Sequence, residues 1–164
     1  MPPDVPAAAL IVRPSARVLL VDASDRVLLF QVHPDQPHAG GVWFTPGGGV
    51  EVGEALRSTA ARELAEETGL AAEPDDLVGP VWVRRHVGPV VDSRETFFAL
   101  RIERHEVDTS SWTDLERDVF AQYRWWSVPQ LAAATDEVFA PRRIAALLPA
   151  VLAGWSGPPI EVGV

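Results

Sequence analysis

The sequence predicts an α+β fold in which helices cover a mixed β-sheet. Three observations support this class: β-rich runs come first, one amphipathic helix follows early, and the chain ends in helical segments. Such an order is typical of strands and helices layered around one core. With 164 residues, of which 47% are apolar and 23% charged, we expect a single domain over residues 1–164.

The first elements should be a β-hairpin, a loop and a helix. Residues 16–33, ARVLLVDASDRVLLFQVH, contain two β-rich runs around a polar turn at 22–25. The PDQPHAGG stretch that follows is too polar and punctuated for core structure. Residues 54–68 predict a helix, because Leu56, Ala60 and Leu64 recur at four-residue spacing and Gly69 is placed to cap its end.

The rest of the chain predicts three further strands and two helices. The strands are LVGPVWVRRHVG (77–88), RETFFALRIE (94–103) and AQYRWWSV (121–128). A short helix begins in VPQLAAATDE, and PRRIAALLPAVLAGW forms a longer one with Pro141 at its first position. We expect the segments 1–14 and 156–164 to be loosely ordered.

Charge and composition exclude several classes of protein. The formal net charge of −9 disfavours a general nucleic-acid surface, because such binders neutralise phosphates with many cations. With no cysteine there is no disulfide framework, thiolate zinc site or cysteine nucleophile. No apolar run reaches the roughly 18 residues of a membrane span, so the sequence predicts a cytoplasmic protein.

The most informative segment is PGGGVEVGEALRSTAARELAEETGL, residues 46–70. Helical spacing places Glu63, Glu66 and Glu67 on one side of the predicted helix, where like charges repel unless a cation joins them. Glutamates alone would favour a solvated helix face. Grouped carboxylates without cysteine form an all-oxygen site that suits Mg²⁺, with Mn²⁺ as the other option.

This segment resembles the Nudix box. Gly48, Glu54 and the run Arg62 to Leu70 match the box position for position, and a tryptophan and a proline precede it as in the family. The resemblance implies a Nudix-type α/β/α sandwich. It also implies a divalent-metal-dependent hydrolase that cuts the pyrophosphate bond of a nucleoside diphosphate linked to another moiety, X.

Site roles follow from the same resemblance. Arg62 would orient the catalytic carboxylates, and the backbone carbonyl of Gly48 would join the metal ligands. The remaining assignments are Glu63, Glu66 and Glu67 as side-chain metal ligands, and Glu54, Gly47 and Gly69 as structural support of the site.

The proton acceptor and the substrate contacts stay open at this point. The acceptor would be Glu63 itself or a later acidic residue; we rank Glu116, in the loop before the last strand, above Glu95 on a strand. Arg84 and Arg85 would contact phosphate or base, or else form the outer face of a strand. Trp43 would stack on substrate or pack in the core.

Two other functions were weighed. The isopentenyl-diphosphate isomerase branch of the family needs a cysteine, which this chain lacks. A catalytically inactive module that binds ligand or protein would have little need of a complete box. Neither the ADP-ribose nor the dinucleoside polyphosphate signature is met, so nucleoside triphosphates, nucleotide sugars and RNA 5′ ends remain, and the acidic charge disfavours RNA. The segment PAAALIV could pair across a homodimer or form an edge strand.

Overall fold

The computed structural model describes residues 9–164. Its elements, with η1 a short 3₁₀ turn, are β1 (Ile11–Val21), β2 (Val27–Val32), β3 (Val42–Phe44), β4 (Gly47–Gly49), α1 (Leu56–Thr68), η1 (Pro74–Asp76), β5 (Val78–Val87), β6 (Val91–Arg101), α2 (Asp114–Val119), β7 (Phe120–Trp126), α3 (Val128–Ala133), β8 (Val138–Ala140), α4 (Ile144–Leu152) and β9 (Ile160–Val162). None of the helices in residues 9–164 is long and apolar enough to cross a bilayer.

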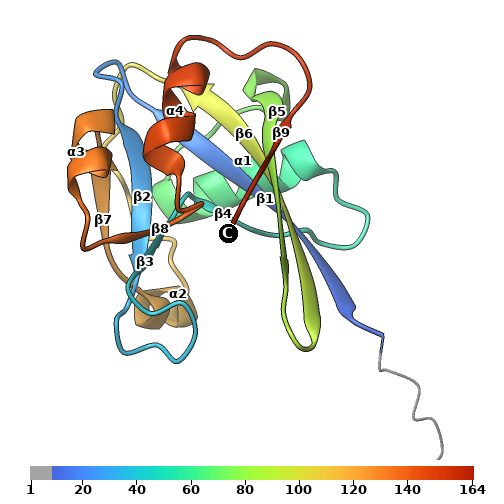
Figure 1. The fold of residues 1–164 in the computed structure, drawn as a ribbon. Helices are drawn as coiled ribbons and strands as arrows, with labels where there is room; N and C mark the ends of the chain where they lie inside the picture. The colour runs from blue at the N-terminus through green and yellow to red at the C-terminus, as the bar shows by residue number, and fades with distance from the viewer. Residues whose placement is uncertain (1–8) are drawn as a thin grey trace, which may run out of the picture.

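The strands form one mixed sheet (Figure 1). Its main path is β8-β3-β2-β1-β6-β5-β9, with β4 also paired to β1 and β7 to β2. The pairs β1·β6, β3·β8 and β5·β9 are parallel, whereas the others are antiparallel. The predicted α+β class with a mixed sheet is therefore confirmed.

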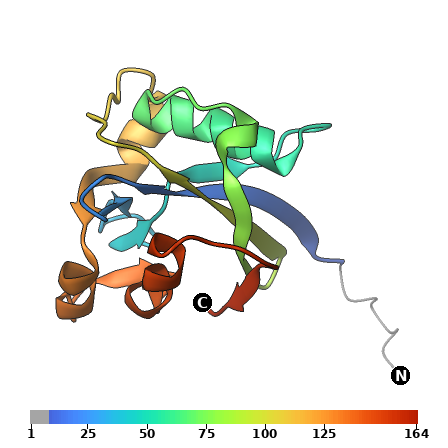
Figure 2. The same cartoon turned by 90° about the horizontal axis from the view of Figure 1, so that it is seen from above.

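Helices cover both faces of the sheet, which makes three layers. Figure 2 shows α1, in green, above the strands and the orange and red α3 and α4 below them. Because side chains alternate along a strand, β1 contributes Ala16, Val18 and Leu20 to the core under α1. Leu19 instead joins the core under α4.

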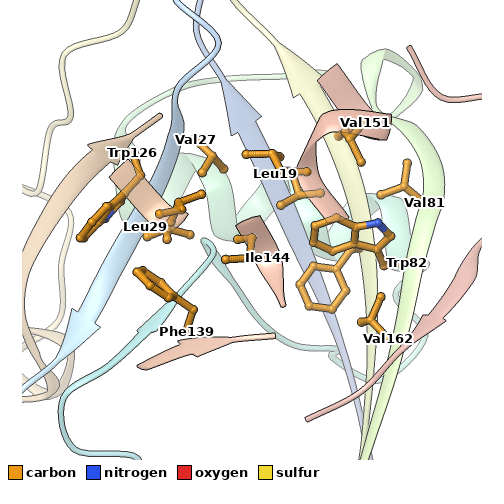
Figure 3. Close-up of a cluster of buried hydrophobic side chains, with 14 of the residues drawn as sticks. Leu19, Val27, Leu29, Val81, Trp82, Trp126, Phe139, Ile144, Val151 and Val162 are labelled. Carbon is orange, nitrogen blue, oxygen red and sulfur yellow. The ribbon is translucent and has the colours of Figure 1, made fainter. Parts of the chain in front are cut away.

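The core under α4 holds the largest buried side chains. Figure 3 shows Trp82, Trp126 and Phe139 gathered with aliphatic residues of β1, β2 and α4. Burying one large apolar side chain contributes about 1.5–3 kcal/mol relative to leaving it exposed. This core fixes how β5 and β6, which carry several predicted site residues, lie against β1.

Helix α1 agrees closely with its prediction. It begins at Leu56, two residues later than expected, and ends at Gly69, whose φ of 75° is left-handed. The N–H of Gly69 donates to the carbonyl of Ala65, so the predicted C-cap is confirmed. Ala60 and Leu64 are fully buried, which leaves the glutamates of the same helix on its other side.

The prediction of two loosely ordered terminal segments was partly wrong. Ile160–Val162 form β9, which pairs in parallel with β5, and Val162 is buried in the α4 core. At the other end, Ile11 to Pro14 belong to β1 and pair with β6, whereas residues 1–8 of the predicted segment lie outside the described residues. Apolar burial and strand pairing explain both differences.

Two helix starts also differ from the prediction. Pro141 does not open the last helix: it directly follows β8, and α4 begins at Ile144. The segment before β7 is not a loop but the helix α2, because Thr113 and Glu116 form a capping box. In that arrangement each side chain accepts a hydrogen bond from the other residue's backbone N–H. The cap fixes the position of Glu116.

Candidate active site on helix α1

Arg62 is the centre of the acidic face of α1. Its guanidinium binds Glu54 through two hydrogen bonds of 2.8 and 2.9 Å. It also donates to Glu63 at 3.0 Å, to Glu66 at 3.3 Å and to the carbonyl of Gly49 at 3.1 Å. One cation thus holds three carboxylates and the loop before the helix together.

Glu54 is the carboxylate most firmly held by this arginine. Hydrogen bonds from Arg62 and from Thr59 lower the pKa of Glu54 to about 2. The carboxylate stays ionised at neutral pH, and its Oε1 also accepts from the N–H of Glu51. Glu54 therefore ties the loop 49–54 to α1; its supporting role in catalysis stays a prediction.

Glu63, Glu66 and Glu116 converge on one point. One carboxylate oxygen from each lies within 4.8 Å of those of the other two. Burial raises the pKa of Glu63, although its contacts with Arg62 oppose the rise. Three carboxylates this close repel, and a hard divalent cation bound by oxygen ligands would remove the repulsion. The set fits Mg²⁺ or Mn²⁺.

The chain between β6 and α2 brings Glu116 to this point. Its backbone and side chains bind the last turn of α1: the N–H of Asp108 donates to the carbonyl of Thr68 at 2.9 Å. The indole N–H of Trp112 donates to the carbonyl of Glu67 at 2.7 Å. Since the capped helix α2 begins directly after Trp112, the Glu116 carboxylate lies against α1.

Glu67 lies beside this set but not in it. Its carboxylate is buried, with the residue 3% exposed, and its Oε2 accepts the N–H of Gly47 at 2.9 Å. Burial raises the pKa of Glu67 to about 8, more than the Gly47 hydrogen bond lowers it. A nearby cation favours the charged form of a carboxylate; the charge of Arg17 lowers the pKa of Glu67 less than burial raises it, so a metal would supply the additional positive charge that ionises this group.

The glycines before α1 are required by space. A Cβ built on Gly48 would lie 2.4 Å from Oε1 of Glu63. Gly47 has a φ of 153°, and its Cβ would lie 2.4 Å from the carbonyl oxygen of Ala16. Larger residues would push the loop away from the glutamates. The metal contact expected of the Gly48 carbonyl stays a prediction.

The structure separates Glu95 from the acidic set. Glu95 lies on the sheet face that α4 covers, with Phe97 of the same strand, whereas α1 covers the opposite face. Its two carboxylate oxygens accept from Arg17, at 2.6 Å, and from Arg84. Burial alone would raise the pKa of Glu95, but these two arginines lower it. It is a poorly placed proton acceptor.

Arg84 and Arg85 also point to opposite faces of β5. Arg84 faces Glu95, while Arg85 binds Asp92 through two hydrogen bonds of 2.7 and 2.8 Å and is half-exposed. Arg94 binds the same aspartate. The two adjacent arginines therefore cannot contact one ligand group together. Arg85 keeps its substrate role only as a prediction.

Trp43 is not available to a ligand, so the stacking role proposed for it was wrong. It is 2% exposed and packs edge to face on Trp126 at 5.1 Å between ring centroids. Its indole N–H donates to Glu137 at 2.7 Å. Trp43 is therefore part of the hydrophobic core, which was the other role expected for it.

Sequence reasoning missed Arg17 and Arg142. Both line a pocket of about 480 Å³ with Arg84 and Glu95. Arg17 precedes Glu95 by 78 residues, so no local spacing links them. Strand alternation from Leu19 would have placed Arg17 on the correct face, but the pairing of β1 with β6 is visible only in the fold.

Comparison with known proteins decides the family. The model of the NUDIX domain matches residues 12–148. The chain belongs to the Nudix family. A protein of Novosphingobium aromaticivorans named RNA pyrophosphohydrolase is 32% identical over 145 residues, which cover 76% of this chain and 83% of that relative. A Roseobacter denitrificans protein of the same name is 32% identical over 134 residues, covering 72% and 78%.

Solved Nudix structures agree in fold. The MutT protein from Methanosarcina mazei Go1 superposes with a TM-score of 0.63 at 19% identity, over 85% of this chain and 92% of that one. A C. elegans Ap4A hydrolase complex gives a TM-score of 0.62 at 16% identity, over 87% and 99%. The predicted Nudix-type α/β/α sandwich is confirmed. The family model and the relatives named RNA pyrophosphohydrolase support a Nudix pyrophosphohydrolase, of a family that generally uses divalent metals.

Proposed function

We propose that this Nudix hydrolase cuts the pyrophosphate bond of a nucleoside diphosphate derivative, with Mg²⁺ held by α1 and α2. The convergence of Glu63, Glu66 and Glu116 within 4.8 Å is the observation that carries the proposal. Glu67 completes the ligand set, because its buried carboxylate lies beside the other three and the charge of Arg17 does not offset the effect of burial on its pKa. The carbonyl of Gly48 is the backbone ligand, and Mn²⁺ would fit the same oxygens.

The metal would supply charge stabilisation for the pyrophosphate oxygens and a bound water that loses its proton readily. The residues of the chain have separate tasks. Arg62 holds Glu63 and Glu66 in register with the loop 49–54. Glu54 anchors Arg62 by both of its oxygens. Together they keep the ligand carboxylates oriented before substrate arrives, which lowers the reorganisation needed during the reaction.

Glu116 is the proton acceptor in this proposal, ahead of Glu63. One of its oxygens is fixed by the N–H of Thr113 at 2.8 Å, and the carboxylate lies among the ligand oxygens of α1. A general base must lie within about 3.2 Å of the water or one water away. Glu116 lies close to the carboxylates that are proposed to bind the metal, as such a base must, whereas Glu95 does not.

RNA with a 5′-terminal polyphosphate is the first substrate class to test. The relatives named RNA pyrophosphohydrolase match over most of their length. The net charge of −9 argued against RNA, but hydrolysis at an RNA end needs only a local phosphate site, and Arg17, Arg84 and Arg142 form a local cluster of positive charge. A binding-only function gains no support from a complete acidic set.

Phosphate and pyrophosphate release tests the proposal. The panel is a 5′-triphosphorylated oligonucleotide, nucleoside triphosphates, ADP-ribose, a nucleotide sugar and a dinucleoside polyphosphate, each with Mg²⁺, Mn²⁺ or EDTA. We expect metal-dependent cleavage of the RNA end at the highest kcat/KM. Metal-dependent cleavage of another class alone would replace RNA as substrate. Cleavage that persists in EDTA would contradict the metal assignment.

A further inference from the structure

Glu95 is clamped between two arginines at the base of a pocket. Its side chain is 6% exposed, and those of Arg84 and Arg17 are 12% and 18% exposed. Arg17 is further held by the carbonyl of Thr45 at 2.9 Å and by the ring of Phe44, 5.2 Å from its guanidinium carbon. The two guanidinium groups therefore have fixed positions, which flexible surface arginines do not have.

The pocket carries an excess of positive charge in an acidic protein. Arg142 lines it together with Arg17 and Arg84, and Glu95 is the one acidic side chain among its lining residues. Counted over the side chains, three guanidinium groups against one carboxylate leave an excess of positive charge. A phosphate group carries the opposite charge and matches guanidinium donors in geometry.

Arg84 has hydrogen-bonding capacity that the protein does not use. Its Nη1 binds Glu95, but its Nε is buried and has no hydrogen-bond partner among the described residues. A buried donor without a partner costs free energy; because this Nε atom has almost no accessible surface, a ligand acceptor would recover that cost only if Arg84 shifted toward it. Arg142 at the rim is exposed and takes part in no ion pair among residues 9–164. Both arginines can bind an anion without breaking an ion pair.

Arg17 links the pocket to the acidic site of α1, although the pocket lies on the opposite face of the sheet. Its guanidinium donates to the carbonyl of Thr45, and two residues further on the N–H of Gly47 donates to Glu67. The charge of Arg17 acts on Glu67. A substrate that uses both sites would therefore extend past this segment.

We propose that this pocket binds a phosphate group that is not cleaved, on Arg17, Arg84 and Arg142, and that Glu95 is the residue that positions the first two. The substrate class at the hydrolytic site would then carry a second phosphate, as the internucleotide phosphate of an RNA 5′ end does. That last step rests on the proposed function, whereas anion binding itself does not.

Inorganic phosphate in EDTA tests anion binding without metal or turnover. Titration calorimetry against phosphate, with chloride at matched ionic strength as reference, would be run on folded protein. We expect Arg84→Ala to weaken binding about tenfold or more and Arg142→Ala about two- to fivefold. Arg143→Ala is the matched control, because this arginine is exposed next to Arg142 but does not line the pocket. Absence of phosphate binding by the wild type, or equal weakening by Arg143→Ala, would overturn the proposal.

Glu95→Gln separates positioning from simple charge. The variant makes the pocket more positive, so charge alone predicts tighter phosphate binding. If Glu95 positions Arg17 and Arg84, binding instead weakens, since an amide offers one oxygen acceptor to two guanidinium donors. The measurement is made below the unfolding temperature of the variant. Tighter binding would remove the positioning role.

Kinetics distinguish the two sources of phosphate. A 5′-triphosphorylated dinucleotide contains an internucleotide phosphate that the matching nucleoside triphosphate lacks. If the substrate supplies the group, Arg84→Ala raises KM for the dinucleotide much more than for the mononucleotide, with kcat little changed. If free phosphate is the ligand, the two KM values change equally. Lack of turnover on both substrates would contradict the proposed function. In that case the phosphate titration alone would test whether the pocket binds an anion.

Discussion

Two ion-pair networks of this protein have opposite composition. On α1 one arginine, Arg62, binds three glutamates. On the sheet one glutamate, Glu95, binds two arginines. The same kind of contact therefore leaves an excess of negative charge at one site and of positive charge at the other. At each site the single residue of one charge orients its partners, and the partners, which are in excess, can bind a ligand of the opposite charge.

The networks also differ in burial. Glu66 and Arg62 are 46% and 25% exposed, so the acidic set is open to an ion from solvent. Glu95 and Arg84 are 6% and 12% exposed. In a buried pair the loss of one partner is costly, because the other charge stays out of water. We therefore expect substitutions on α1 to change catalysis and substitutions at Glu95 to change stability.

The largest effect is expected for Glu116→Gln. If its carboxylate accepts the proton of the attacking water, kcat falls by about 10²- to 10⁴-fold. The amide keeps the size of the side chain, and α2 should still cap. Steady-state kinetics at saturating Mg²⁺ measure the loss, and circular dichroism checks the fold. A kcat within twofold of wild type would assign the proton to Glu63.

Glu67→Gln should lower kcat by about 100-fold. Mutating a residue that only hydrogen-bonds to a metal ligand already lowers activity or metal affinity by about 10- to 100-fold, and Glu67 is proposed as a ligand itself. Because the pKa of Glu67 is about 8, its carboxyl group is largely protonated at pH 7 without metal, so Glu67→Gln should leave the melting temperature of the metal-free protein nearly unchanged. Kinetics and thermal unfolding of one preparation test both statements. Full activity would exclude Glu67 from the ligand set.

Glu95→Gln reverses this pattern. We expect the free energy of unfolding at pH 7 to fall by about 3 kcal/mol, because two guanidinium groups lose their shared carboxylate. Denaturant unfolding measures it. Neutralisation of the more exposed Arg62, as Arg62→Gln, is the counterpart and should cost less stability. A larger stability loss for Arg62→Gln would contradict the comparison.

The wild type and Glu95→Gln should also differ in the pH dependence of their stability. The pKa of folded Glu95 lies below 4.5, the ordinary value of a glutamate, so its stabilising contribution is complete above that value. The contribution is lost as the pH falls through the lowered pKa. Between pH 5 and the acid transition, the wild type should therefore lose more stability than Glu95→Gln. Parallel curves would mean that Glu95 is not ionised in its pair.

The smallest effect tests the sheet edge next to this network. Val162→Ala should cost about 1.5 kcal/mol, the value of two buried methylene-sized groups, since β9 covers β5 at Arg84. Exposed Val164→Ala is the control and should be within about 0.5 kcal/mol of wild type. Equal stability of the two variants would show that β9 contributes little.

The sequence predicted helix α1 and its C-cap well because their information is local. Helical spacing alone relates Glu63 to Glu66, and Gly69 caps the helix where expected. The capping box of Thr113 and Glu116 was an available local signal for α2 that was read as a loop. By contrast, the Arg17–Glu95 pair depends on strand pairing across the chain, which no local pattern contains.

Two other predictions differed from the structure because they depend on tertiary packing and on the local distribution of charge, which short sequence patterns do not contain. Trp43 and a surface tryptophan look alike in the sequence, and only the packing of β3 against β7's Trp126 buries the former. Net charge likewise sums over the whole surface. An overall charge of −9 did not reveal that three arginines line one pocket, which is why it was a weak argument against RNA.

The parallel pairing of β1 with β6 has a consequence for synthesis of the chain. Ile11 pairs with Val91 and Val21 with Arg101, so each residue of β1 must wait for one made much later. At about 5–20 residues per second, a ribosome needs about 4–16 s to produce that partner. Throughout this time Leu19 and its apolar neighbours on β1 lack the neighbouring strand β6, so nascent chains should depend on chaperones more than the final stability of the protein suggests.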